Sequence, residues 1–561
     1  MNPDLDQIAT DYWDLTLEFS PTFATLIGDH RFDDRIEDHS ESAEAAHRDR
    51  LGGIRDRLDR LGSEHLIGQD LVTARILAAE IDDAVRLIDL GLTELRSDQM
   101  DGPHVGLLMS APQLAAATPE HAAALLDRFV QVPASLASAA DRFRAGAARG
   151  RTPAARCVGR ALNMIDGYLA SALDDDLFVN ISGPADWSGE PEWRERLRRV
   201  VVDHVRPGFS AMRDTLADEL MPVARDDDHS GLCWLDDGEE IYSALLATYT
   251  SLPVTPDELF EFGIAEVEQN LPVRYREIGA RALGTDDLGE IFARLRDDPS
   301  LRFSSAEEIM DLATSGLDRA RDAMGDWFGR LPQAPCRIEP VPAVLAADAP
   351  AAYYFPPASD GSRPGTYFVN LRDPQSQGRY EAESIAFHEA IPGHHLQLAI
   401  ASELTDLPAF RRTGIGNTAY VEGWGLYAER LAEEMGLYAD DLGRLGMLAA
   451  DSWRSGRLVT DTGLHAKGWS RQQAIDYFAE HTPVAAGEIE VEIDRYLAIP
   501  GQAVTYKVGQ REIFALRERA RGALGERFDI AGFHDVVLGS GAVVLPVLAE
   551  LVERWVTEVS G

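Results

Sequence analysis

The chain has 561 residues, of which 45% are hydrophobic, so it is long enough to bury a large core. Its 94 acidic and 53 basic residues give a formal net charge of −41. A field of that sign repels nucleic acid and anionic membrane surfaces, so we expect neither as a partner.

The first residues, 1–6, are acidic and lack the cationic stretch and apolar run of a secretory signal. No segment approaches about 18 consecutive apolar residues, which argues against a membrane-spanning helix. The cysteines, Cys157, Cys233 and Cys336, are odd in number and widely spaced, which predicts buried reduced thiols rather than disulfides or a cysteine-based zinc site. We therefore expect a cytoplasmic protein.

Amphipathic helical patterns dominate the first part of the chain. Three segments carry apolar side chains at spacings of three and four among charged ones: residues 5–27, 65–96 and 119–149. A polar, acidic run at residues 225–231 separates them from the rest. We therefore expect an N-terminal helical half, residues 1–230, and a second half, residues 231–561.

Capping signals mark helix starts in the second half. Thr255 is followed by a proline and, three residues on, by Glu258, while Ser305 has Glu308 at the same spacing. Each pair is typical of a capping box. A last helix is predicted over about residues 546–556.

Strand patterns are confined to one region. Residues 338–346 and 366–371 are rich in aromatic and β-branched side chains and are bounded by Pro, Gly and Asp, which predicts short strands. The run 356–365 between them is dense in turn-forming residues and is predicted to be a loop. With the helical segments, these strands indicate a mostly α fold with a small β-sheet.

A cluster of histidines follows: His388 beside Glu389, then His394 and His395. Zinc hydrolases commonly place two histidines four residues apart on one helix, which rotates the second by about 40° and lifts it by about 6 Å. On an unbroken helix His394 would lie about 120° away from His388, and His395 would return to its face about 10.5 Å further along. Neither spacing puts two imidazoles on one zinc ion.

Pro392 and Gly393 offer a way to bring a later histidine back. Proline removes a helical hydrogen bond, and glycine permits conformations closed to other residues. The chain can therefore bulge or break here and return one of the two later histidines to His388. The alternative is a helix that ends at these residues and leaves three surface histidines.

A third ligand is expected in the predicted helix 418–429, which contains Gly423 and Gly425. Glycines in a helix permit close approach by another helix, although each costs about 1 kcal/mol. Glu422 sits beside them and Glu429 follows two turns later on the same face, so either can be the ligand. We favour Glu422.

These motifs resemble a known bacterial family, the domain of unknown function 885, which is grouped with the zincin metallopeptidases. The resemblance runs nearly end to end through the following stretches: residues 21–30, 98–103, 354–370, 388–397, 422–424, 461–469 and 494–507. It implies a zincin-like fold, in which a large helical body has a deep cleft and the small sheet lies beside the metal helix.

By looser similarity the pattern is like that of the helical peptidases related to angiotensin-converting enzyme, thimet oligopeptidase and the Taq-type carboxypeptidases. Matching their Gly-His pair to Gly393 and His394 implies His394 as the second ligand. The same similarity implies His388 and Glu422 as the other ligands and Glu389 as the base. Dipeptidyl peptidase III likewise carries a motif lengthened by one residue, so an insertion does not by itself abolish such a site.

Those peptidases also supply a tyrosine from a glycine-containing segment late in the chain to stabilise the oxyanion, and the resemblance assigns that role to Tyr506. Further candidates for binding a substrate carboxylate or assisting the oxyanion are His465, Arg495, Tyr496 and Lys507. Arginine suits a carboxylate because its fork is bidentate. For Arg495 the alternative is an ion pair with a neighbouring acid.

The implied reaction is zinc-dependent hydrolysis of short peptides, with Zn²⁺ as the cofactor. Zinc lowers the pKa of its bound water to about 7, and Glu389 takes the proton as the water attacks the amide carbonyl. Residues 367–370 can offer a strand edge for an extended peptide.

Two alternatives remain: a zinc-dependent amidase acting on a non-peptide substrate, and a non-catalytic binding protein on the same scaffold. Glu389 argues against the second alternative, because zinc storage requires no base. Neither a Gly-x-Ser-x-Gly nor a Gly-Lys-Ser/Thr motif occurs, so an α/β-hydrolase and a P-loop protein are not expected.

Overall fold

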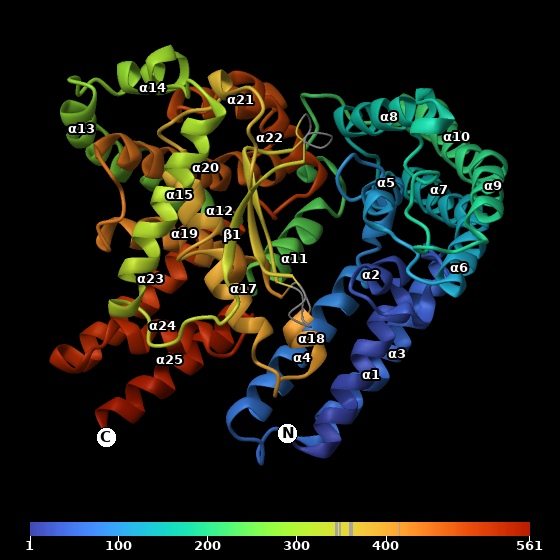
Figure 1. Ribbon diagram of the computed structural model, residues 1–561, viewed down its shortest axis with the longest axis horizontal. Helices are drawn as coiled ribbons and strands as arrows, with labels where there is room; N and C mark the ends of the chain where they lie inside the picture. The colour runs from blue at the N-terminus through green and yellow to red at the C-terminus, as the bar shows by residue number, and fades with distance from the viewer. Residues whose placement is uncertain (343–345, 347–348, 358–362, 414–415) are drawn as a thin grey trace. The chain divides into compact units, whose positions relative to one another are not determined.

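The computed structural model of the chain describes residues 1–342, 346, 349–357, 363–413 and 416–561. The protein is mostly helical and has a small three-stranded sheet, as predicted (Figure 1). Internal contacts divide it into two compact units. The first unit contains Met1–Ala244, Leu464–Gln472 and Asp494–Pro500, and the second contains Leu245–Gly463, Gln473–Ile493 and Gly501–Gly561. Among the described residues, no helix is long and apolar enough to cross a membrane.

The first unit is built from helices. Their bounds are α1 Pro3–Phe19, α2 Pro21–Leu26, α3 Glu41–Leu61, α4 Gly68–Asp89, α5 Pro103–Ser110, α6 Pro119–Val130, α7 Val132–Ala148, α8 Ala155–Ala170, α9 Glu190–Val200 and α10 Arg206–Asp214. Helices α1, α3 and α4, blue in Figure 1, pack on one another, and α7 and α8 pack against α10. The core of this second group of helices, which includes α6, contains large side chains such as Phe129, Phe143 and Phe209.

Prolines and glycines divide the three helical segments predicted in this unit. The segment 5–27 breaks at Pro21, where α2 begins, because proline has no N–H to continue α1. The segment 119–149 is interrupted in the same way by Pro133 in the first turn of α7. The segment 65–96 ends its regular helix at Asp89, before the left-handed Gly91.

The second unit holds most of the later helices. Their bounds are α11 Gly238–Thr250, α12 Pro256–Ile264, α13 Leu271–Ala282, α14 Leu288–Asp297, α15 Ala306–Ala323, α16 Ala382–Glu389, α17 His394–Ser402, α18 Ala409–Thr413, α19 Thr418–Glu434, α20 Asp441–Ala466, α21 Arg471–His481, α22 Ala486–Ala498, α23 Thr505–Leu524, α24 Ile530–Leu538 and α25 Leu545–Ser560. Helices α11, α20, α21 and α22 contribute residues to both units.

The capping predictions are confirmed at one helix and half confirmed at the other. Thr255 and Glu258 form a complete capping box at the start of α12. At α15 the side chain of Ser305 accepts from the N–H of Glu308, but the Glu308 carboxylate accepts from the N–H of Ser304 instead of closing the box. The last helix, α25, is longer than predicted.

The sheet has the strand order β1-β3-β2, with bounds β1 Cys336–Pro340, β2 Ala352–Phe355 and β3 Gly365–Val369. β1 runs parallel and β2 antiparallel to β3. β2 was not predicted as a strand. Because β3 is paired on both sides, the expectation that residues 367–370 offer a free edge is wrong. Residues 343–345 of the predicted first strand and 358–362 of the predicted loop lie outside the described residues.

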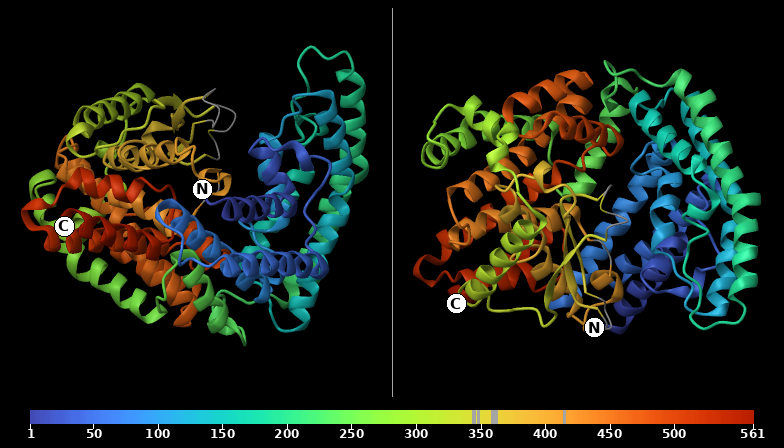
Figure 2. Two further views of the ribbon diagram at one scale, coloured as in Figure 1. Left: turned by 90° about the horizontal axis from the view of Figure 1, so that it is seen from below. Right: turned by 45° about the horizontal axis from the view of Figure 1, so that its top comes forward.

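The helices packed around α19 hold the residues of the candidate site in position. Within the second unit, α19 lies along α23, and α16 packs against α15, α19 and β2. Among the C-terminal helices, red in Figure 2, α25 packs against both α23 and α24.

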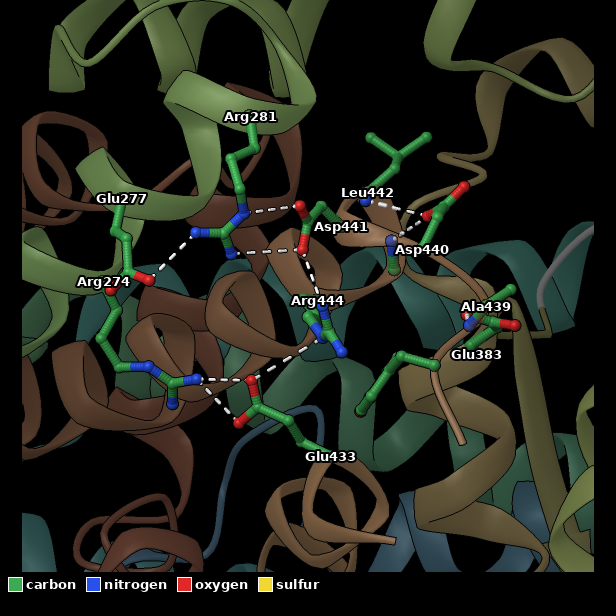
Figure 3. Close-up of polar contacts among 12 residues, drawn as sticks. Arg274, Glu277, Arg281, Glu383, Glu433, Ala439, Asp440, Asp441, Leu442 and Arg444 are labelled. Atoms are coloured by element: carbon green, nitrogen blue, oxygen red, sulfur yellow. Dashed lines mark hydrogen bonds and ion pairs between the residues drawn. The ribbon is translucent and has the colours of Figure 1, made fainter. Parts of the chain in front are cut away.

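Ion pairs connect α19 and α20 to α13 (Figure 3). Arg274 of α13 donates to Glu433 near the end of α19, and Arg281 of α13 donates to Asp441 at the start of α20. Arg444 donates to Asp441, one helical turn before it. These contacts hold the C-terminal end of α19 and the start of α20 to the same neighbouring helix.

Candidate metal centre

The helix of the histidine motif breaks where the sequence predicts it to break. α16 ends at Glu389 and α17 begins at His394, and Gly393 between them has nonhelical angles (φ −80°, ψ −128°). A Cβ at Gly393 would lie 1.9 Å from the carbonyl oxygen of His388, so only glycine fits the turn. The peptide bond before Pro392 is cis. The indole N–H of Trp424 donates to the carbonyl of Pro392 (3.0 Å) and fixes the turn against α19.

This break brings His388, His394 and Glu422 together. Their candidate ligand atoms all lie within 4.8 Å of one another. Oε2 of Glu422 lies 3.5 Å from Nε2 of His388 and 3.6 Å from Nε2 of His394, distances that are long for hydrogen bonds. Two ligands about 2.0–2.1 Å from a tetrahedral zinc ion are roughly 3.4 Å apart. The two nitrogens and one oxygen therefore fit the donor set and spacing of a zinc site with an open position.

Glu429 supports His388 from the opposite side of the ring. The Nδ1–H of His388 donates to Oε1 of Glu429 (2.8 Å), and the hydroxyl of Ser384 donates to Oε2 (2.5 Å). A carboxylate on the second ring nitrogen fixes the tautomer that leaves Nε2 for a metal. The structure therefore places Glu422 near Nε2 of His388, with the other candidate ligand atoms, and Glu429 at Nδ1 on the opposite side of the ring.

The charges of this cluster favour a cation. Burial by itself lowers the pKa of His388, but the hydrogen bonds and charges of Glu422 and Glu429 outweigh it and raise this pKa to about 10. Burial by itself raises the pKa of Glu422, but the facing imidazoles of His388 and His394 hold it well below its usual range.

Two glycines of α19 explain how the helices approach so closely. A Cβ at Gly425 would lie 2.7 Å from Nε2 of His388, so the ring packs directly on the helix backbone. A Cβ at Gly423 would lie 2.5 Å from Cα of Gly509 on α23. The predicted close approach of another helix is therefore confirmed.

His395, the alternative second ligand, turns away toward the sheet. It is buried, and its Nδ1 shares a hydrogen bond of 2.9 Å with the hydroxyl of Tyr354 on β2. Burial lowers the pKa of His395 to about 4. In this arrangement the side chain that joins His388 is His394.

Glu389, the predicted base, is held by the edge strand. Its Oε2 accepts from the backbone N–H of Tyr354 (3.1 Å). Glu389 and His388 line a cavity of about 330 Å³, together with Ala352 and residues of α20 that include Trp453 and Arg454. A carboxylate next to a candidate ligand therefore faces a space that can admit water or a small molecule.

Tyr506, at the start of α23, lies near the same cluster. Its ring centre is 6.4 Å from that of His388, and the two rings are nearly parallel. The guanidinium of Arg457 also lies over the Tyr506 ring, 4.7 Å from its centre. Lys507, the next residue, is buried in ion pairs with Asp451 (2.6 Å) and Glu266 (2.8 Å).

Three further candidates belong to the first unit. His465 is buried: its Nδ1 accepts from the N–H of Leu232 (3.1 Å), and its Nε2–H donates to the carbonyl of Tyr496 (3.0 Å). Tyr496 is itself buried, whereas Arg495 is half-buried. Asp494, the acid next to Arg495, pairs with other arginines, Arg160 and Arg471.

Some residues in and around the candidate site were missed by sequence reasoning. Tyr354 lies in a stretch noted for its family resemblance, but β2 was not predicted, so its contact with Glu389 was not foreseen. Arg454 carried no signal, because its contact with Tyr506 joins positions far apart in the chain. Glu429 was weighed as a ligand and not as a partner of His388.

Comparisons with known proteins agree with this fold. The family described as "Bacterial protein of unknown function (DUF885)" matches residues 21–552. A crystal structure of a candidate lipoprotein from Colwellia psychrerythraea is similar over 100% of both chains, at 27% identity and a TM-score of 0.89. A candidate lipoprotein of unknown function from Shewanella oneidensis shares the fold over 98% of this chain and 99% of its own, at 18% identity and a TM-score of 0.77. No match was found among curated proteins. The chain is a member of the bacterial DUF885 family.

Proposed function

We propose that the protein is a zinc-dependent metallopeptidase of the zincin type that hydrolyses short peptides. The observation that carries this proposal is the convergence of His388, His394 and Glu422, with Glu389 beside them on the cavity. Two imidazoles and one carboxylate are the protein ligands of several catalytic zinc sites, which keep one position open. A zinc ion there would polarise a carbonyl and lower the pKa of water to about 7. The predicted deep cleft remains part of this proposal.

Glu389 serves as the general base. The N–H of Tyr354 holds its Oε2 and orients the carboxylate, so Oε1 takes the proton of the attacking water. Delivery of that proton to the leaving amine completes the cycle. The role requires a carboxylate within reach of the ligands, and Glu389 directly follows His388 on α16.

The outer edge of β2 is suited to hold the substrate backbone. The N–H of Asn370 donates to the carbonyl of Ala351 (2.8 Å), so in the alternating antiparallel pattern the N–H and C=O of Ala352 and the C=O of Tyr354 point away from β3. The N–H of Tyr354 also points outward but is already bound to Glu389. Ala352 also lines the cavity. An extended peptide added at this edge would run past Glu389.

Tyr506 is proposed as the donor to the oxyanion. It is half-buried, and its ring lies beside that of His388. A preorganised hydroxyl aimed at the developing negative charge typically contributes about 100- to 1,000-fold in rate.

The test is metal content together with peptide hydrolysis, measured on the purified full chain and its variants. We expect near-stoichiometric zinc in the wild type and in Glu389→Gln, and its loss in His388→Ala. His395→Gln is the matched control and should keep zinc, because His395 faces the sheet. A peptide library read by mass spectrometry should be cleaved by the wild type and left intact by Glu389→Gln. A wild-type protein that binds no zinc after supplementation would refute the proposal.

A further inference from the structure

Arg454 of α20 lines the cavity beside the candidate metal centre, where its charge acts on Glu381 without forming an ion pair with it. Within the described part of the chain, no carboxylate oxygen lies within 4.0 Å of its guanidinium nitrogens. Two other arginines nearby are paired: Arg430 with Asp451 (3.2 Å) and Arg457 with Glu492 (2.8 Å). In a chain with 94 acidic and 53 basic residues, an unpaired arginine on a cavity wall requires an explanation.

Aromatic rings hold the guanidinium of Arg454. Its Cζ lies 5.2 Å from the ring centre of Trp453 and 5.8 Å from that of Tyr506, and its buried Nε has no hydrogen-bond partner among the described residues. Cation–π contacts of this kind contribute only about 0.5–2 kcal/mol. They position the planar fork and leave its donors for an anion. A carboxylate would satisfy both its charge and its geometry.

Arg454 lies at a useful distance from the reacting groups. The ring centre of Tyr506 lies 5.8 Å from the guanidinium carbon of Arg454 and 6.4 Å from the ring centre of His388. The guanidinium carbon is therefore at most about 12 Å from the imidazole, a span of three to four extended residues at ~3.3–3.6 Å each. A carboxylate bound to Arg454 places a peptide bond near His388 only if that bond lies within a few residues of the carboxylate.

Besides Glu389 and Glu429, two further acids line the same cavity, Glu381 and Glu488, and their charges would repel a bound carboxylate. Burial, reinforced by the charge of Glu488, raises the pKa of Glu381 to about 7, and burial also raises that of Glu488. The protonated, neutral form of Glu381 is therefore populated near neutral pH. This reduces the repulsion that an incoming carboxylate meets.

We propose that Arg454 binds the free α-carboxylate of the substrate, so that the enzyme cleaves peptides close to their C-terminus. This inference rests on the proposed peptidase function and names its substrate class. Arg454 acts here as a specificity-determining residue that contacts substrate outside the reacting bond. The free C-terminus distinguishes such peptides from internal segments of folded proteins.

The first test measures binding without turnover. Glu389→Gln loaded with zinc is titrated with a tetrapeptide that has either a free C-terminal carboxylate or a C-terminal amide. We expect the free acid to bind about 10- to 100-fold more tightly, as for a charge-assisted bidentate contact. Adding Arg454→Met should remove that preference, and Arg454→Lys should retain part of it. Arg444→Met, on the same helix but paired with Asp441, is the matched control and should keep the preference.

The second test locates the cleaved bond in wild-type digests by mass spectrometry. Products that lose one to three C-terminal residues, with amidated peptides cleaved about 10- to 100-fold more slowly, would support the inference. Equal binding and cleavage of acid and amide would overturn it while leaving the peptidase assignment intact. Zinc-loaded protein that binds the acid through Arg454 but cleaves no peptide would overturn the proposed function instead. A preference that depends on an acidic side chain within the peptide, and not on its C-terminus, would also overturn the inference.

Discussion

His388 has a carboxylate facing each of its ring nitrogens, and the two carboxylates have different roles. Glu422 faces Nε2 at 3.5 Å, close to the separation of two ligands on one zinc ion, while Glu429 accepts directly from Nδ1–H at 2.8 Å. Ser384 donates to Glu429 and limits its movement. The orientation of the imidazole thus depends on a residue that does not belong to the candidate ligand set.

We predict that Glu429→Gln lowers zinc affinity by about 10- to 100-fold, because partners of ligating histidines typically contribute that much. The amide keeps the shape of the side chain but no longer supplies a negative charge to the imidazole. Competition with a chromophoric chelator measures the effect. Ser384→Ala, which removes only the donor to Glu429, should weaken zinc binding less. Unchanged affinity in Glu429→Gln would show that the contact has no part in metal binding.

At the scale of single residues, the sequence identified the candidate ligands that converge in the structure but not all of the supporting contacts. His388, Glu389 and Glu422 could be proposed from residue type and spacing. The choice of His394 over His395 came from the family resemblance. Local spacing cannot decide it, because the angles of the turn at Gly393 determine which imidazole returns to His388.

Helix α19 depends on two glycines that serve different neighbours. Gly423 lets the backbone of α23 approach at Gly509, and Gly425 lets the ring of His388 lie on the helix surface. Gly393 has the same importance in the turn before α17. Gly423 and Gly425 are required by contacts with other elements, whereas Gly393 is required within its own turn, where a Cβ would meet the carbonyl oxygens of Phe387 and His388.

We predict that Gly425→Ala preserves the fold but lowers zinc affinity by at least about 10-fold, because a methyl 2.7 Å from Nε2 of His388 must displace the ring. Circular dichroism and chelator competition measure the two effects. Gly522→Ala on α23 is the matched control. No atom lies within 4 Å of its Cβ, so it should leave zinc affinity unchanged and stabilise the helix by up to about 1 kcal/mol. Equal zinc affinity in both variants would contradict this packing argument.

Strand β2 illustrates what periodicity could not reveal. Ala352–Phe355 is four residues long and is followed by a pair of prolines, so the turn signals outweighed its aromatic residues. Its strand identity comes from pairing with β3. The same pairing leaves the N–H of Tyr354 facing Glu389, so a contact at the candidate site depends on an element that was not predicted.

Across the whole molecule, the two units are not two halves of the sequence. Residues 1–244 form the first unit together with Leu464–Gln472 and Asp494–Pro500. His465 belongs to one of these later stretches and joins it to Leu232 through its Nδ1. Burial lowers the pKa of His465 to about 3 and keeps the ring neutral.

We predict that the buried His465 makes the folded protein less stable at acidic pH. Its folded-state pKa of about 3 lies below the ordinary value of 6.5, so the neutral ring's contribution is fully present above about pH 6.5 and is lost as the pH falls toward 3. The expected slope from this one group is at most about 1.4 kcal/mol per pH unit. His465→Gln should be less stable at pH 7 but show a shallower decline between about pH 6 and 4.

Urea unfolding of the full chain at several pH values measures this slope. His65→Gln, at an exposed histidine, is the control and should leave the slope unchanged. His534, whose pKa burial also lowers to about 3, would sustain part of the decline in every variant. A slope in His465→Gln equal to that of the wild type would exclude the histidine as a source of acid sensitivity.

The sequence by itself determined the helical character of the chain, the capping of α12, the break at Pro392–Gly393 and the residue types of the candidate metal centre. These follow from local chemistry: helical periodicity, the missing N–H of proline and the conformational range of glycine. Only the tertiary structure decided that Glu429 supports His388, that β2 forms the sheet edge, that His465 is buried and that Arg454 faces the cavity unpaired. Each of these depends on contacts between residues distant in the chain, which no local pattern encodes.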